Sequence, residues 1–182
     1  MIKLLSLFLV LVLFACSINP DQITNKKTEG LYDTKDSEDS KNTELYEILF
    51  EKDSLLFQIG FNKIDTSQVS AMTAMDFEFY HDEHGITETK QDFIKSIASI
   101  EGLPFKTWRI LKKESMEVFP LCTDNKQKLY GAIQNGIHDF YQQEKGEKAR
   151  KTNTAKFTHL WIIEDGDWKL KRVLSYDHQI PK

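Results

Sequence analysis

Apolar residues recur every three or four positions between residues 43 and 61, which predicts an amphipathic helix. Asn42 or Thr43 can cap its start. Its apolar face carries Tyr46, Leu49, Phe50, Asp53, Leu56, Phe57, Gly60 and Phe61. Asp53 is the acidic exception on this face, and a carboxylate among apolar side chains needs a partner or a raised pKa. We therefore take Asp53 as the first candidate for a functional site.

Shorter elements come next along the chain, and their period changes from helical to strand-like. They are a helix over residues 66–73, a strand over 75–82, a turn at 83–85 and a third helix over 88–100. Every later segment is typical of a strand: residues 107–112, 115–121, 128–142, 156–163 and 168–177. Helices first and then a run of antiparallel strands predict an α+β domain.

The last two predicted strands form a hairpin around the turn at residues 164–167. A four-residue loop pairs Ile163 with Trp168, Trp161 with Leu170, His159 with Arg172, and Phe157 with Leu174. The face expected to line the core carries Phe157, His159, Trp161, Ile163, Trp168, Leu170, Arg172, Leu174 and Tyr176.

This register places His159 and Arg172 side by side among apolar residues. An arginine cannot shed its charge and needs a counter-ion when it is buried. Asp53 is the predicted counter-ion, because it is the acid on the apolar face of the first helix. We therefore expect a buried group of Asp53, His159 and Arg172.

The first sixteen residues have the pattern of a secretory signal. Lys3 precedes an apolar run over residues 4–15 that is too short to cross a bilayer and ends before Cys16. This ending resembles the lipobox of bacterial lipoproteins, which implies cleavage after residue 15 and acylation of Cys16, so that several acyl chains hold the mature protein on a membrane. Ser17 is not the aspartate that retains lipoproteins on the inner membrane, which favours the outer membrane of the cell envelope, facing the periplasm. A surface-facing orientation stays open.

Residues 16–42 differ in composition from the rest of the chain. They are rich in Asp, Lys, Ser, Thr and Asn, with Tyr32 as the one aromatic residue, and so predict a disordered tether. Residues 43–182 then form the folded domain. The net charge of −4 argues against a nucleic-acid partner, which would require a concentrated basic face.

The order of the motifs in the folded part is similar to that of a known superfamily. The segments that carry the likeness are residues 48–57, 76–82, 136–141, 157–161, 165–170 and 176–178. They resemble the nuclear transport factor 2-like superfamily, close to its SnoaL-like branch and an associated domain-of-unknown-function family. The resemblance implies a cone, in which a curved antiparallel sheet wraps around about three N-terminal helices and opens into an apolar pocket. Enzymatic relatives such as ketosteroid isomerases use a pocket carboxylate as base, but the resemblance assigns no catalytic role here.

The polar and aromatic candidates for the lining of such a pocket are Asp53, His81, His138, His159, Trp161, Arg172 and Tyr176. The pattern leaves open whether His138 faces inward, because apolar neighbours compete for that side. Two functions fit: a membrane-tethered small-molecule-binding or accessory domain, or an isomerase, cyclase or hydrolase with Asp53 or His159 as general base.

No cofactor or metal is expected from the sequence. The histidines at positions 81, 138, 159 and 178 match no metal-ligand spacing, and zinc needs three or four converging ligands. The expected partners are the membrane, through the lipid anchor, and a small apolar ligand. Self-association into a homodimer stays open.

Overall fold

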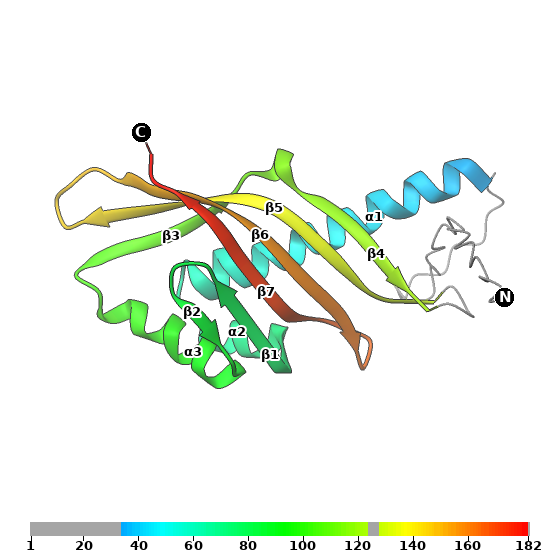
Figure 1. Cartoon of the computed structure of the whole chain (residues 1–182), viewed down its shortest axis with the longest axis horizontal. Coiled ribbons are helices and arrows are strands. Elements are labelled where there is room, and N and C mark those ends of the chain that lie inside the picture. Colours follow the sequence, from blue (N-terminus) through cyan, green and yellow to red (C-terminus); the bar gives the residue numbers. More distant parts are fainter. Residues whose placement is uncertain (1–33, 124–127, 182) are drawn as a thin grey trace, which may run out of the picture.

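The computed structural model describes residues 34–123 and 128–181, drawn in colour in Figure 1. The helices are α1 (Thr34–Ser54), the π-helix η2 (Leu55–Phe61), α2 (Thr66–Met72), α3 (Lys90–Ser99) and the 3₁₀ turns η3 (Ile100–Gly102) and η4 (Lys113–Ser115). The strands are β1 (Thr73–His81), β2 (Gly85–Thr87), β3 (Phe105–Leu111), β4 (Glu117–Cys122), β5 (Leu129–Glu144), β6 (Arg150–Glu164) and β7 (Asp167–Gln179). Within these residues, no helix has the length and apolar character of a membrane crossing.

These seven strands belong to one curved, unclosed sheet with the order β2-β1-β7-β6-β5-β3. Strands β3 and β4 both pair with β5, β3 along its second half and β4 along its first. The α+β class and the cone-like arrangement predicted from the sequence are confirmed. The sheet is mixed, however, because β1 runs parallel to β7. The prediction of a wholly antiparallel sheet is wrong at this pair.

The helices pack on the concave face of the sheet, where the core lies. Figure 1 shows α1 running across the strands, with α2 and α3 gathered near β1 and β2. Along β6, alternate residues are buried against the helices: Ala155, Phe157, His159 and Trp161. From residue 42 to the end of η2 the buried residues are Leu45, Leu49, Asp53, Leu56 and Gly60. The predicted helical face is thus confirmed around Asp53, and Leu45 joins it.

The first helix departs from the sequence prediction at both ends. It begins at Thr34, well before the predicted caps, so the end of the predicted tether is helical. The remainder of that tether, the signal and Cys16 lie outside the described residues. At Leu55 the winding changes from α to π until Phe61. The π-helix η2 packs closely against α2 at Gly60, because a Cβ on this residue would lie 2.7 Å from the side chain of Val69.

The β6–β7 hairpin turns more tightly than predicted. Asp165 and Gly166 both have positive φ (51° and 86°), as a two-residue turn between right-twisted strands requires. Near the turn the predicted pairs are confirmed, since Ile163 lies opposite Trp168 and Trp161 opposite Leu170.

A β-bulge then shifts the register of the hairpin. Lys171 is an extra residue in β7, so that His159 lies opposite Val173 and Leu160 opposite Arg172. A shift of one residue moves every later side chain to the other face. Val173 and Ser175 are therefore buried, whereas Arg172, Leu174 and Tyr176 leave the core face. The predicted pairs of His159 with Arg172 and of Phe157 with Leu174 are wrong.

Candidate functional site

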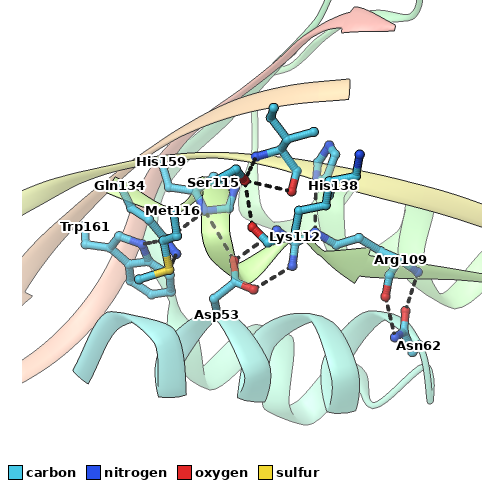
Figure 2. A network of polar contacts seen from close by, with 11 residues as sticks. Asp53, Asn62, Arg109, Lys112, Ser115, Met116, Gln134, His138, His159 and Trp161 are labelled. Carbon is cyan, nitrogen blue, oxygen red and sulfur yellow. Dashed lines mark hydrogen bonds and ion pairs between the residues drawn. The ribbon is translucent and has the colours of Figure 1, made fainter. Parts of the chain in front are cut away.

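A buried ion pair joins the first helix to the sheet. Asp53 and Arg109 are 2% and 3% exposed, and their contact is bidentate: Nη1 donates to Oδ1 at 2.6 Å and Nη2 to Oδ2 at 3.0 Å (Figure 2). Two parallel hydrogen bonds of this kind fix geometry as well as charge. Both carboxylate oxygens of Asp53 are thereby held by Arg109 of β3.

Arg109 is held in place from several sides. Its guanidinium stacks on the Phe57 ring, with Cζ 3.9 Å from the ring centroid. Asn62, which comes directly after η2, exchanges two hydrogen bonds with the Arg109 backbone at 2.8 and 2.9 Å and so fastens the edge of β3. The Arg109 Nε–H donates to Nδ1 of His138 at 2.8 Å. Since an arginine can only donate, Nδ1 of His138 is an acceptor without a proton.

A second group lies on the other side of Asp53 and is centred on Gln134. The Trp161 indole N–H donates to Oε1 of Gln134 at 2.8 Å, and Nδ1 of His159 lies 3.1 Å from the same oxygen. Because the indole can only donate, the amide oxygen must face it, and Nδ1 of His159 must then donate as well. The same His159 Nδ1 lies 3.9 Å from Oδ2 of Asp53, beyond hydrogen-bond range.

Both imidazoles of this network are neutral. Burial lowers the pKa of His138 and of His159 well below 6.5, and the Arg109 charge lowers both pKa values further. A neutral ring carries one proton, so the two hydrogen-bond patterns fix two opposite tautomers. His138 carries its proton on Nε2 and can donate there, whereas Nε2 of His159 has a free lone pair and can accept.

These two Nε2 atoms are the buried side-chain nitrogens or oxygens without a hydrogen-bond partner among the described residues. Both histidines line one cavity of about 230 Å³ between the helices and the concave face of the sheet. Its other walls are mostly apolar and include Phe57, Phe61, Phe79, Phe93, Ile97, Ile100, Phe140 and Val173. An unpartnered buried polar atom costs about 1–3 kcal/mol. A ligand that pairs with both nitrogens would remove that cost.

A larger depression of about 1240 Å³ lies elsewhere, between η2, the end of α3 and β3. It is open to solvent, and its lining includes exposed residues such as Ile110 and Leu103. Neither of the unpartnered histidines borders it. The smaller, more enclosed cavity is therefore the candidate site.

Solved structures with the same architecture come from several bacteria, at low sequence identity. A nuclear transport factor 2-like superfamily protein from Salmonella enterica aligns with a TM-score of 0.58 and 12% identity over 77% of this chain and 93% of its own. The beta subunit of a putative aromatic-ring-hydroxylating dioxygenase from Novosphingobium aromaticivorans gives 0.59 and 8%, over 76% and 91%. ActVI-ORFA from Streptomyces coelicolor gives 0.59 and 11%, over 74% and 98%.

The chain has the nuclear transport factor 2-like fold. The resemblance inferred from the sequence motifs is thus confirmed at the level of the fold. No protein-family model and no curated protein sequence matches the chain. At these identities the solved structures define the architecture of the domain, and the site has to be interpreted from its own residues.

Within this nuclear transport factor 2-like fold, the predicted site residues separate into three groups. The fold brings Asp53, His138, His159 and Trp161 into one buried network and so settles the inward direction of His138. His81 also lines the cavity, at its outer end.

Arg172 and Tyr176 lie elsewhere. Arg172 Nε donates to Glu78 at 2.9 Å outside the network, and Tyr176 is 39% exposed. The predicted group of Asp53, His159 and Arg172 does not exist, because the bulge in β7 turns Arg172 away and Arg109 takes its place beside Asp53.

Arg109 and Gln134 were not found by sequence reasoning. Arg109 lies between Trp108 and Ile110, so the apolar alternation assigns its neighbours to the core, whereas Ile110 is 48% exposed. The available signal was a charged residue between two apolar residues of one strand. Whether the Arg109 side chain points into the core, however, depends on which face of the sheet the helices cover.

A second polar cluster lies at the outer end of the cavity. His81, Asp82 and His178 each offer an atom within 4.8 Å of the others, and the His81 ring stacks on His178 at 4.3 Å. Sequence spacing did not reveal this cluster, because β1 and β7 bring residues 81 and 178 together only through their parallel pairing.

Proposed function

We propose that the domain binds a compact, uncharged and mostly apolar molecule that carries one hydrogen-bond acceptor and one donor. The observation that carries this proposal is the pair of unpartnered imidazole nitrogens on two histidines that line one cavity, with Nε2–H of His138 as donor and Nε2 of His159 as acceptor. The nuclear transport factor 2-like neighbours are consistent with a small-molecule-binding domain.

The cavity restricts the size and charge of the ligand. Its 230 Å³ is below the usual 300–1,000 Å³ of ligand sites, so a single ring or a short chain fits. The Asp53 charge neutralises Arg109 and both histidines are neutral, so the walls offer no uncompensated charge for an ion. The Phe157 ring packs against both histidines, at 5.1 Å from His138 and 4.3 Å from His159. His138 lies opposite Ala155, four residues from His159 along β6, so the two polar groups of the ligand must be spaced apart.

A probe of this description is 4-hydroxyacetophenone, which has a carbonyl at one end and a hydroxyl at the other. Calorimetric titration should show that it binds more tightly than acetophenone, which lacks the hydroxyl. In His159→Phe that preference should vanish, a loss of about tenfold for one hydrogen bond (about 1.4 kcal/mol).

The matched control is Phe79→Leu, which alters an apolar wall of the same cavity. It should weaken both probes equally and keep the preference for the hydroxyl. Equal affinity of wild type for both probes would contradict recognition by His159, and no binding of either would contradict the pocket itself.

A second candidate function is proton transfer with His159 as general base. The lone pair on its Nε2 favours this role over Asp53, whose oxygens are both held by Arg109. Exchange of the methyl protons of acetophenone with deuterium, monitored by NMR, tests it, because this probe has no hydroxyl to occupy Nε2 of His159. Exchange that is catalysed by wild type and lost in His159→Phe supports an enzyme; no exchange in the presence of binding supports a binding module.

We also propose that this pocket is presented from a membrane by acylation of Cys16. The support is the apolar run before Cys16 and its small-residue ending. Cys16→Ala should move the protein from the membrane fraction to the soluble fraction, measured after alkaline carbonate extraction. A mutant that remains in the membrane fraction would contradict the lipid anchor.

A further inference from the structure

A serine, a histidine and an aspartate form a hydrogen-bonded chain at the outer end of the cavity. Nδ1 of His178 lies 2.6 Å from Oδ1 of Asp82, and Nε2 of the same ring lies 3.4 Å from Oγ of Ser175. The side chain of His178 is 2% exposed, and Ser175 is 4% exposed. Ser175 lines the cavity that also holds His138 and His159.

The backbone is shaped to bring this chain together. Residues three apart on a regular strand face opposite sides, yet Ser175 and His178 meet on one side. Asp177 between them has φ of 58°, a conformation that few residues other than glycine adopt, and it turns His178 back toward Ser175. Asp82 comes directly after β1, where His81 pairs with Ser175 across the parallel ladder. The Asp82 backbone N–H then donates to the Ser175 carbonyl at 3.2 Å.

The hydrogen bonds set the roles of the three groups. Burial raises the pKa of Asp82, but hydrogen bonds from the His178 backbone and side chain outweigh it, so the pKa lies below its ordinary value. Asp82 is therefore a carboxylate, and it accepts the proton of Nδ1. Nε2, the ring nitrogen of His178 that does not face Asp82, is directed at the Ser175 hydroxyl and is placed to accept its proton. This is the arrangement in which a histidine activates a serine nucleophile.

We propose that Ser175 is a nucleophile that accepts the acyl group of a compact ester bound in this cavity, with His178 as general base and Asp82 orienting it. The inference rests on the proposed function, because it takes the ligand carbonyl to be the acceptor for Nε2–H of His138. A small, uncharged ester with a short or single-ring acyl group is the substrate class that the cavity volume allows.

The reaction balances with water as the second reactant. Oγ of Ser175 bonds to the carbonyl carbon while its proton passes to Nε2 of His178, and the ester C–O bond then breaks. The leaving alcohol takes that proton. A water molecule, deprotonated by His178, attacks the acyl-serine, and the serine regains its proton as the acid leaves. One ester and one water thus give one acid and one alcohol.

The same cluster could hold a divalent metal through His81, Asp82 and His178. The distance between Asp82 and His178 favours the hydrogen-bonded chain instead. Two ligands at about 2.0–2.2 Å from a tetrahedral ion are roughly 3.3–3.5 Å apart. The 2.6 Å between Oδ1 and Nδ1 is the length of a charge-assisted hydrogen bond.

The test combines a covalent serine probe with hydrolysis of 4-nitrophenyl acetate. A fluorophosphonate should label Ser175, located by peptide mass spectrometry, and labelling should disappear in Ser175→Ala. His178→Gln should slow both labelling and hydrolysis by ~100-fold. The matched control is Ser99→Ala, because Ser99 at the end of α3 lies outside the cavity lining and donates to the Ser96 carbonyl instead of a histidine. It should leave both rates unchanged, as should EDTA.

Each outcome decides the proposal once the thermal melt of each variant shows a folded protein. Labelling at another residue, or hydrolysis that survives Ser175→Ala, would overturn it. Loss of activity with EDTA would overturn it in favour of a metal at the same cluster. If wild type binds 4-hydroxyacetophenone but is neither labelled nor active, the nucleophile fails while the proposed function stands. If it does not bind the probe either, both fail.

Discussion

Arg109 and Arg172 lie in the same sheet but have different surroundings. Arg109 is 3% exposed, holds Asp53 through two hydrogen bonds and stacks on Phe57. The side chain of Arg172 is 25% exposed and pairs with Glu78, which is 33% exposed. Water can solvate the outer pair when one member is removed, but it cannot reach the inner one. The free energy of each pair should therefore depend on its surroundings far more than on its distances.

The inner pair also sets the chemistry of the cavity. Asp53 cancels the Arg109 charge, and Arg109 fixes the tautomer of His138 through its third hydrogen bond. Neither member of the outer pair lines the cavity. Disturbing the first pair should affect both folding and binding, whereas disturbing the second should affect neither strongly.

The largest effect is expected from Asp53→Ala. It leaves the Arg109 charge buried and unpaired, which should lower the free energy of unfolding by about 3–5 kcal/mol in urea denaturation. The double variant Asp53→Ala with Arg109→Met should recover much of this loss, since it removes the stranded charge. Glu78→Ala is the matched control on the outer pair. Equal losses in Asp53→Ala and Glu78→Ala would contradict the distinction between the two pairs.

The second-largest effect is expected from acid, which should destabilise the protein through His138 and His159. Since the pKa values of His138 and His159 are lowered in the fold, the unfolded chain binds more protons below pH 6.5, the ordinary histidine value. Stability is thus full above pH 6.5 and falls as the pH drops below it, with a slope approaching about 1.4 kcal/mol per pH unit for each histidine. Urea denaturation between pH 7.5 and 5.5 measures it.

His159→Phe sharpens this prediction, because the new ring keeps the stacking with Phe57 and cannot titrate. This variant should reduce the slope of the free energy of unfolding against pH by the contribution of one histidine. His81, whose pKa burial also lowers, adds a smaller share that remains in the variant. An unchanged slope would show that His159 does not titrate as its surroundings require.

The sequence predicted the helical half of the inner network but not its arginine. Asp53 stood out because polar residues are rare on an apolar helix face, and that signal is local. The inward direction of His159 and Trp161 was predicted correctly, because buried residues alternate along β6 without interruption, although His159 pairs with Val173 and not with Arg172. The inward direction of Arg109 could not be predicted, because contacts of β3 with β5 and with Asn62 after η2 decide which side of β3 faces the core. These partners lie far from Arg109 in the sequence.

The bulge at Lys171 was invisible for a different reason. The sequence of β7 is compatible with two alternations of inward and outward residues after Lys171, one with the extra residue and one without it. The pattern therefore does not reveal the shift. The parallel pairing of β1 with β7 is also a long-range choice that neither strand encodes alone. These two features decide which residues reach the outer end of the cavity.

The smallest effect is expected from Arg172→Met. Its partner Glu78 can be solvated, so the free energy of unfolding should change by about 1 kcal/mol or less. Binding of 4-hydroxyacetophenone should stay at the wild-type affinity. A loss as large as that of Asp53→Ala would place Arg172 in the inner network after all.

The bulge in β7 has an evolutionary consequence. Upstream of Lys171, Trp168 and Leu170 stay in the core whatever happens beyond it, while Val173 and Ser175 owe their place in the cavity to this one residue. Insertion or loss of a single codon here would exchange the cavity-facing residues of the second half of the strand in one event. A lineage with this domain could thus change what its cavity accepts without a series of point mutations, each of which must pass through an intermediate with a mismatched core.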